Sequence, residues 1–244
     1  MEIIVDIHTH ILPGVDDGAE NFDEAIEMLR IAQNNGTTDI VLTPHYLTRD
    51  MRGVTFSKVD ISSRFEIFKE AVSSYFPKLN LYLGAETHAI SNLYEAIEGD
   101  QIITINNTNY VLLEFGFSDH IRRAYNASIS LMERGYIPII AHPERYDFVK
   151  KDPLSIMEFV DLGALLQINS GSLAGDYGTA SKDIALIYLD EGIATTVSSD
   201  GHSIFQRTPD LSEAFAFVSS AFSETYAEDL FSRNPLSIIR GKRV

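Results

Sequence analysis

The sequence predicts an α/β fold built on parallel strands. Short β-branched apolar runs alternate with longer segments of helical spacing along the 244 residues, and this alternation is typical of parallel strands joined by crossover helices. Single barrels of this kind span about 250 residues, so one domain over residues 1–244 accounts for the chain without a linker. The pattern alone fits a closed barrel and an open, doubly wound sheet equally well.

The spacing of apolar residues predicts the position of each strand and helix. Seven runs read as buried strands, at residues 3–7, 38–42, 80–84, 110–115, 137–141, 164–168 and 193–198. Six segments with helical spacing lie at residues 22–35, 57–75, 119–134, 153–162, 179–191 and 210–221. Asn21 and Glu24 resemble a capping pair at the start of the first helix. Residues 222–240 predict one more helix and a tail that contains Asn234 and Pro235.

The composition excludes several classes of protein. Nineteen basic residues against 35 acidic ones give a net charge of −16, which argues against nucleic acid and anionic membrane surfaces as partners. Without Cys, the chain can form neither a disulfide framework nor the nucleophile of a cysteine-based phosphatase. The N-terminal residues do not resemble a signal peptide, and no apolar run approaches a membrane span. We expect a cytoplasmic protein without membrane insertion; its oligomeric state stays open.

Residues of the types that bind metals follow the ends of most predicted strands. A lone His at such a position is more often structural than a ligand, so the repetition carries the argument. The carboxyl ends of parallel strands meet on one face, where we expect these side chains to converge. His8 and His10 point the same way because a strand repeats every two residues. Asn169 and Ser170 follow the sixth strand and are candidates for hydrogen bonds at the rim.

The combined set of donors predicts a site for several ions. Imidazole and carboxylate are ligands of zinc, manganese and iron. The candidates are His8, His10, Asp17, His45, Glu86, Glu114, His142, Asp200 and His202. They are too many for one ion and suit two or three divalent ions that together can clamp a phosphoryl group. Asp17 is preferred over Asp16 because it adjoins Gly18, although an Asp-Gly pair is also ordinary turn chemistry.

These motifs resemble the PHP (polymerase and histidinol phosphatase) superfamily and, more narrowly, the bacterial capsule-type protein tyrosine phosphatases. The matching blocks are residues 6–18, 43–45, 84–86, 113–115, 140–146 and 199–202. The block at 140–146, IAHPERY, is the most specific, since PHP members in general share only the metal ligands. The resemblance implies a distorted (β/α)7 TIM-like barrel of PHP type that holds three ions, commonly manganese, with iron or zinc as alternatives.

The resemblance also implies roles for individual residues. One ion would lie among His8, His10, Glu86 and Asp200, a second among Glu86, Glu114 and His142, and a third among Asp17, His45 and His202. Arg145 and Arg207 resemble phosphate-binding arginines, and a guanidinium fork matches phosphate oxygens. For each arginine, the alternative is a surface salt bridge.

The implied activity is that of a metal-dependent protein tyrosine phosphatase. A metal-bound hydroxide would attack the phosphorus of phosphotyrosine in line. The implied partner is the tyrosine-rich tail of a bacterial tyrosine kinase that controls capsule or exopolysaccharide assembly.

Three other functions are compatible with such a site. Another PHP phosphoesterase (histidinol-phosphate phosphatase, nucleotide phosphatase or nuclease) would use the same donors, and the negative charge disfavours the nuclease. An amidohydrolase often has a lysine at the end of its fourth strand, where this chain has Glu114 and no Lys. A non-catalytic metal-binding regulator is disfavoured because all nine donor candidates are present.

The segment 46–56 directly follows the candidate ligand His45. It carries Arg49 and Arg52 and has aromatic residues at its edges, so we expect it to border the mouth of the site, with a solvated loop as the alternative. We expect His88 not to be a ligand and His120 to lie at the surface, where it opens a helix.

Overall fold

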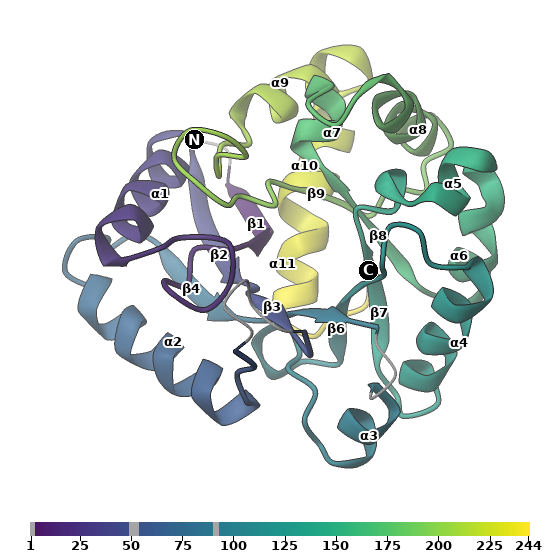
Figure 1. The fold of residues 1–244 in the computed structure, drawn as a ribbon. Coiled ribbons are helices and arrows are strands. Elements are labelled where there is room, and N and C mark those ends of the chain that lie inside the picture. Colours follow the sequence, from purple (N-terminus) through teal and green to yellow (C-terminus); the bar gives the residue numbers. More distant parts are fainter. Residues whose placement is uncertain (1–2, 49–53, 90–92) are drawn as a thin grey trace.

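The computed structural model describes residues 3–48, 54–89 and 93–244. Arg49 and Arg52 of the predicted rim segment therefore lie outside the described residues. Within the described part, nine strands form two sheets in which every paired strand is parallel (Figure 1). The prediction of an α/β fold with parallel strands is confirmed.

The smaller sheet has the order β1-β2-β4. Its strands are β1 (Ile4–Thr9), β2 (Thr37–Leu42) and β4 (Asn80–Leu83). The larger sheet has the order β3-β5-β6-β7-β8-β9. Its strands are β3 (His45–Tyr46), β5 (Glu86–His88), β6 (Tyr110–Glu114), β7 (Ile137–Ala141), β8 (Leu165–Asn169) and β9 (Thr196–Ser198). All seven predicted strands are present, and only the short β3 and β5 are additional.

The two additional strands continue β2 and β4 after a short break in each. Pro44 has no N–H to donate to a ladder, so β2 cannot run on unbroken. At Gly84 a Cβ would lie 2.9 Å from Cγ1 of Val41, so the close approach there requires glycine. Beyond the breaks, His45 and Glu86 become register partners in the larger sheet, which brings two predicted donors side by side.

The sheets also meet where β1 and β9 end. Thr9 and Gly201 form an isolated parallel bridge. The backbone N–H of Asp200 donates to the carbonyl of His8 at 2.9 Å, and that of His10 donates to the carbonyl of Gly201 at 2.9 Å. This seam aligns donors from the first and last strands.

The α-helices before residue 222 lie around the outside of the sheets in Figure 1, whereas those that follow lie near the centre of the view. The helices that the sequence predicted are α1 (Phe22–Asn34), α2 (Lys58–Val72), α4 (Ile121–Met132), α6 (Met157–Leu162), α8 (Thr179–Asp190) and α9 (Ser212–Ala221). Three short helices were not predicted: α3 (Leu93–Glu98), α5 (Asp147–Lys151) and α7 (Ser170–Ala174). The Asn21 side chain caps α1 by accepting from the N–H of Glu24 at 3.1 Å, as the sequence suggested. No helix in the described ranges is both long and apolar enough to cross a bilayer.

The C-terminal segment differs from its prediction. It is helical from α10 (Glu224–Glu228) through a π-helical turn (Asp229–Arg233) to α11 (Asn234–Ile239). Asn234 and Pro235 therefore lie within a helix and not in a tail. Pro235 is tolerated because it stands in the first turn of α11, after a π-helical turn has changed the hydrogen-bond register.

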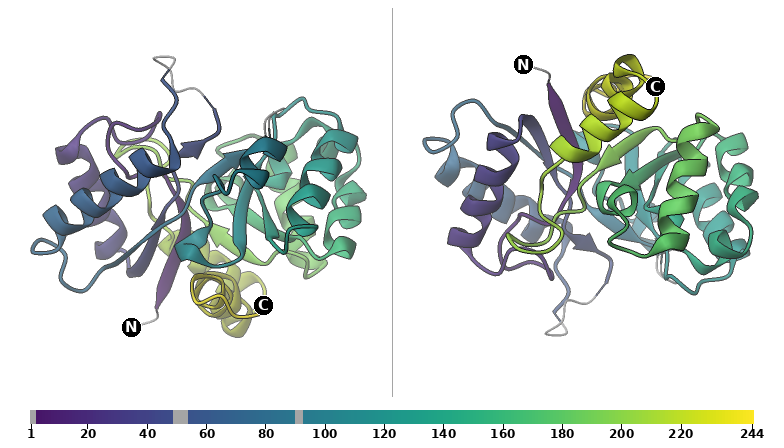
Figure 2. Two further views of the ribbon diagram at one scale, coloured as in Figure 1. Left: turned by 90° about the horizontal axis from the view of Figure 1, so that it is seen from below. Right: turned by 90° about the horizontal axis from the view of Figure 1, so that it is seen from above.

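The last helix covers the end of the strands opposite the donors. In Figure 2 the C-terminal helices lie at the same end of the molecule as the N-terminus, where β1 begins. Ile238 and Ile239 are buried in one apolar cluster with Val5, Ile7 and Ile139. Each such side chain contributes about 1.5–3 kcal/mol when fully buried. This packing covers the amino ends of the strands, so the polar residues lie at the carboxyl ends.

Candidate metal centre

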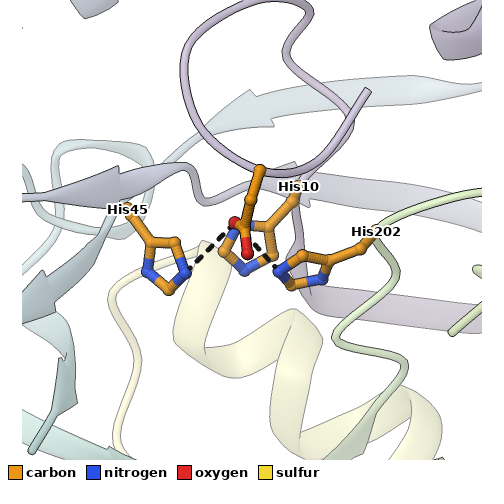
Figure 3. A group of neighbouring side chains, drawn as sticks. His10, His45 and His202 are labelled. Atoms are coloured by element: carbon orange, nitrogen blue, oxygen red, sulfur yellow. Dashed lines mark ion pairs between the residues drawn. The ribbon is translucent and has the colours of Figure 1, made fainter. Parts of the chain in front are cut away.

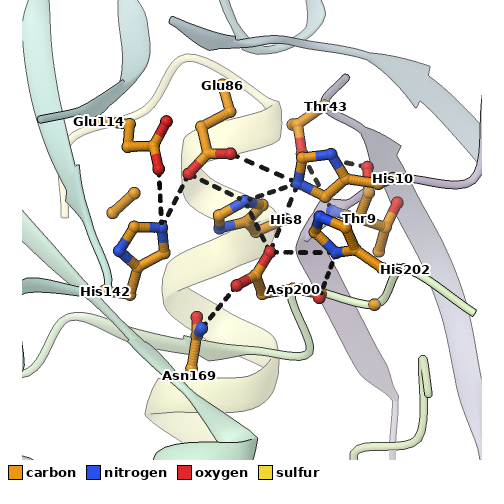
Figure 4. Close-up of polar contacts among 12 residues, drawn as sticks. His8, Thr9, His10, Thr43, Glu86, Glu114, His142, Asn169, Asp200 and His202 are labelled. Atoms are coloured by element: carbon orange, nitrogen blue, oxygen red, sulfur yellow. Dashed lines mark hydrogen bonds and ion pairs between the residues drawn. The ribbon is translucent and has the colours of Figure 1, made fainter. Parts of the chain in front are cut away.

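All nine predicted donors lie in one cluster at the carboxyl ends of the strands, and Figure 4 shows those other than Asp17 and His45. They form four overlapping groups whose candidate ligand atoms lie within 4.8 Å of one another. The groups are His10, Asp17, His45 and His202; His8, His10 and Asp200; His8, Glu86 and His142; and His45, Glu86 and Glu114. Each group has the composition of a divalent-metal site.

The innermost group has the spacing of a coordination shell. Nε2 of His8 lies 3.2 Å from Nε2 of His10, and Oδ1 of Asp200 lies 3.4 Å from both nitrogens. Ligand atoms around a tetrahedral ion with bonds of about 2.0–2.1 Å stand roughly 3.3 Å apart. These three side chains therefore fit one ion without rearrangement of the backbone.

Neighbouring side chains fix which ring nitrogens face this group. Nδ1 of His8 lies 2.8 Å from Oε1 of Gln167, and Nδ1 of His10 lies 2.6 Å from Oδ2 of Asp16. Both partners are acceptors, so in the neutral rings each Nδ1 carries the proton. The two Nε2 lone pairs then face each other, and a bound cation would satisfy both.

Unpartnered buried atoms point to the same place. Oδ1 of Asp200 and Nε2 of His202 are buried without a hydrogen-bond partner. The other oxygen of Asp200, Oδ2, accepts from Nδ2 of Asn169 at 2.7 Å, and Nδ1 of His202 donates to the carbonyl of Asp200 at 2.8 Å. A buried polar atom left unsatisfied costs about 1–3 kcal/mol. The donor set thus fits metal ions, which would engage these atoms.

The outer group consists of Asp17 and three histidines, His10, His45 and His202, and Figure 3 labels the histidines. Oδ1 of Asp17 lies 3.4 Å from Nε2 of His45 and 3.4 Å from Nε2 of His202. Asp16 instead accepts from the backbone N–H of His45 at 2.9 Å and orients His10. The geometry favours Asp17 as the ligand and Asp16 as the residue that holds a ligand in place.

Glu86 joins the groups. Its Oε1 lies 2.9 Å from Nε2 of His142 and 3.4 Å from Nε2 of His8, and its Oε2 lies 2.9 Å from Nδ1 of His45. Glu114 lies 3.6 Å from His45 and 3.8 Å from His142. Among the four donor groups Glu114 occurs with His45 and Glu86, whereas the resemblance implies that it shares an ion with Glu86 and His142.

Charge pairing within the cluster shifts the acidities of its members. Burial raises the pKa of Glu86, but His8 and His45 outweigh it and hold the pKa well below its ordinary value. Burial lowers the pKa of His45, but the Glu86 carboxylate outweighs it and raises the pKa to about 9. Protonated imidazoles thus offset the carboxylates in the ion-free protein, and binding of cations must release those protons.

Two donors lie on strained backbone. His142 has φ +33° and Asp200 has φ +52°, both in the left-handed region that non-glycine residues avoid. Arg207 has φ +53°. Each such conformation costs on the order of 1–3 kcal/mol, and such residues concentrate at functional sites.

Both predicted phosphate-binding arginines reach the cluster. Nη1 of Arg145 lies 3.2 Å and Nη2 of Arg207 lies 2.5 Å from Oδ2 of Asp200. The guanidinium carbon of Arg145 lies over two aromatic rings, 4.6 Å from the centre of the Phe117 ring and 4.3 Å from that of the Tyr177 ring. Stacking on two aromatic faces holds the guanidinium in one orientation.

Sequence reasoning named Asp16 only as the second choice of ligand, whereas in the structure it orients His10. It missed Gln167, which orients His8, although a polar residue within a buried strand indicates that it has a polar partner. Nothing in the sequence pointed to Phe117 or Tyr177.

The remaining histidines differ in their relation to the cluster. His88 is outside the donor groups but lies 3.0 Å from Oε2 of Glu114 through its Nδ1. His120 is exposed and caps α4 by accepting from the N–H of Arg122 at 3.2 Å. Among the rim candidates, Asn169 reaches Asp200.

Comparison with known proteins places these features in context. Residues 4–240 match the family model described as "Capsular polysaccharide synthesis, CpsB/CapC". The tyrosine-protein phosphatase YwqE of Bacillus subtilis is 33% identical over 220 residues, which cover 90% of this chain and 85% of YwqE.

Solved structures are also similar. One from the study of YwqE from Bacillus subtilis and CpsB from Streptococcus pneumoniae, described as unique metal-dependent tyrosine phosphatases, has a TM-score of 0.91 at 29% identity and covers 99% of this chain and 96% of its own. The phosphotriesterase homology protein from Escherichia coli has a TM-score of 0.63 at 12% identity, covering 97% and 98% of the two chains, which shows the fold alone.

The fold and the cluster define a class: α/β proteins with a shared set of His and carboxylate donors at the carboxyl ends of parallel strands. Within that class, the chain belongs to the CpsB/CapC family of capsular polysaccharide synthesis. The resemblance to capsule-type tyrosine phosphatases, first seen in the motifs, is confirmed.

Proposed function

We propose that the chain is a metal-dependent protein tyrosine phosphatase. The observation that carries this proposal is the convergence of nine donors beside two arginines that share one carboxylate oxygen. The arrangement combines sites for cations with guanidinium groups that match phosphate oxygens. Relatives named as tyrosine-protein phosphatases support the choice of substrate.

The proposal assigns all nine donors as ligands of two or three divalent ions. Manganese is the first choice, with iron or zinc as alternatives, because imidazole and carboxylate suit all three. Such ions, when bound, supply Lewis acidity and lower the pKa of water. Glu86 is suited to bridge ions because its two oxygens face different histidines, His142 and His45.

Arg145 and Arg207 bind the substrate phosphate and offset the charge that develops on its oxygens. In the structure both arginines contact Oδ2 of Asp200. A phosphate oxygen that replaces Oδ2 of Asp200 in some of these contacts would bind both guanidinium groups where they already lie. The rings of Phe117 and Tyr177 keep Arg145 there while its partner changes.

We also propose that residues 1–244 form one phosphatase domain whose two sheets are parts of a single distorted (β/α)7 barrel. Counting β2 with β3 and β4 with β5 gives seven strands, in agreement with the seven that the sequence predicts. The seam between Thr9 and Gly201 supports closure between the first and last strands.

The substrate in the cell is, on this proposal, the phosphotyrosine-bearing tail of a bacterial tyrosine kinase of capsule or exopolysaccharide synthesis. The family's description and the names of the relatives support this assignment. A cytoplasmic location stays a prediction.

The test is hydrolysis of a phosphotyrosine peptide by purified protein, before and after removal of metal with a chelator and re-addition of Mn²⁺. We expect activity only with metal, and we expect His142→Ala and Arg145→Ala to lose most turnover of p-nitrophenyl phosphate while remaining folded. Histidinol phosphate and a nucleotide monophosphate serve as competing substrates. Preference for either of these, or near-wild-type turnover in both variants, contradicts the proposal.

A further inference from the structure

We propose that a hollow beside the donor cluster receives the aromatic ring of the phosphotyrosine side chain. This inference rests on the proposed phosphatase function and adds the part of the site that selects an aryl over an alkyl phosphate. The hollow has a volume of about 250 Å³. It opens next to the outer donors, on the side formed by the residues that precede and follow the segment 49–53.

The inner side of the hollow belongs to the metal centre. Asp17, His45 and Glu114 line it, and all three are members of the donor groups. The ring of phosphotyrosine is joined to phosphorus through a single oxygen. When the phosphate lies on the donors, the ring must therefore lie in a space that borders those same donors, as this hollow does.

Apart from Asp16, Thr48 and His88, the other described residues that line the hollow are apolar or aromatic. Val15, Tyr46, Leu47, Val54 and Phe56 line it, and the described lining residues include no Lys or Arg. An aryl ring buries apolar surface against such a wall and gains edge or face contacts with the Tyr46 and Phe56 rings. The short, polar side chain of phosphoserine reaches no comparable surface.

The Phe56 ring is held in place before any ligand binds. The guanidinium of Arg64, on α2, lies 4.8 Å from the centre of the Phe56 ring. Phe56 also packs against the buried cluster between α1, α2 and the smaller sheet. A side chain that is ordered before binding loses little conformational freedom when the ligand binds. More of the free energy of its contacts therefore contributes to affinity.

A second, larger hollow provides the contrast. It has a volume of about 940 Å³ and borders the site at Arg207, but none of the nine donors lines it. Three aromatic residues line it, Tyr177, Phe205 and Phe217. Tyr177 contacts Arg145, whereas the Phe205 ring is 85% exposed and is not packed into a wall. The larger hollow is therefore the weaker candidate for the ring, and Phe205 offers a matched control for Phe56.

The test compares Phe56→Ala and Val54→Ala with Phe205→Ala in the metal-loaded enzyme. We expect the first two to raise KM for a phosphotyrosine peptide, by on the order of tenfold for Phe56→Ala, with little change in kcat. Inhibition by inorganic phosphate, which needs the arginines and the ions but has no ring, should stay within about twofold. Metal content, by elemental analysis, and unfolding temperature should match the wild type, as should Phe205→Ala throughout.

The outcomes separate the two proposals. A wild-type enzyme without phosphotyrosine phosphatase activity removes the proposed function itself. An active wild type with unchanged KM in Phe56→Ala and Val54→Ala overturns the ring site, and a raised KM in Phe205→Ala assigns the ring to the larger hollow. Weaker phosphate inhibition in proportion to the rise in KM also overturns it, because the loss then concerns the phosphate and not the ring.

Discussion

The inner and outer parts of the donor cluster differ in burial. The inner part consists of His8, His10, Glu86, His142 and Asp200, whose side chains are at most 2% exposed. In the outer part the Asp17 side chain is 40% exposed, that of His45 23%, that of Glu114 12% and that of His202 8%. Several inner donors also have a second partner that fixes their orientation, such as Gln167 for His8.

This difference indicates a division of labour. Buried, oriented donors form a rigid site. Each buried carboxylate there needs a nearby positive charge, because removing a charge from water is costly. Exposed donors tolerate water and adjust more easily. We therefore expect the inner part to determine whether the protein binds metal at all, and the outer part to adjust affinity and admit substrate.

The largest expected effect distinguishes the two parts directly. Asp200→Asn keeps the shape of an inner donor but removes its charge, and we expect kcat/KM for p-nitrophenyl phosphate to fall by about 10³-fold or more. Asp17→Asn makes the same change in the outer part and should cost only about 10- to 100-fold. Steady-state kinetics at saturating Mn²⁺ checks both; equal losses would erase the distinction.

A change behind the inner donors should have an intermediate effect. Asp16→Asn removes the charged acceptor that orients His10, and loss of such a partner lowers metal affinity by about 10- to 100-fold. Titration of the metal-free protein with Mn²⁺ measures this. The exposed Asp23, changed to Asn, is the control, and equal affinities in the two variants would show that orientation of His10 does not matter.

Loss of one of the aromatic rings that contact Arg145 should have a smaller effect, and it should weaken the binding of phosphate. Tyr177→Ala removes one of the two rings that stack on the guanidinium, a contact of about 0.5–2 kcal/mol, or roughly 2- to 30-fold in affinity. We expect a higher KM and weaker phosphate inhibition with unchanged metal content. Tyr177→Phe keeps the ring and should retain most of the affinity. Loss of metal in Tyr177→Ala would instead assign the residue to the cluster.

A separate expected effect concerns pH and the stability of the metal-free protein. The pKa of His45 is raised to about 9 in the fold. A raised histidine stabilises the folded state fully below the unfolded value of about 6.5, and this contribution disappears as pH rises through about 9. The unfolding temperature should therefore fall between pH 6.5 and 9, and less so in His45→Gln. Identical slopes in the two proteins would contradict the assignment.

The sequence predicted the donors well because their positions follow from topology. Parallel strands bring their carboxyl ends together whatever the distance along the chain, so His8 and His202 could be expected to meet. The strands were predictable for a related reason, since buried parallel strands are continuous apolar runs. Neither inference needs knowledge of side-chain packing.

What could not be predicted depends on contacts between distant surfaces. Tyr177 stacks on Arg145 only because α7 and the segment after it are packed beside the segment that follows β7. Pro235 interrupts the helical pattern of residues 222–240 in the sequence, and the π-helical turn before it, which places Pro235 in the first turn of α11, could not be predicted from local spacing. At the breaks near Pro44 and Gly84 the chain passes from the smaller sheet to the larger one. The spacing of apolar residues in the sequence does not predict this change of sheet.

The central claim is that these nine side chains hold divalent cations in a single shared site. Crystals of the Mn²⁺-loaded protein, with anomalous scattering recorded at the manganese edge, test it most directly. The account predicts two or three anomalous peaks per chain, at least one of them in contact with His8, His10 and Asp200. A single peak elsewhere, or none within the cluster at saturating Mn²⁺, would contradict it.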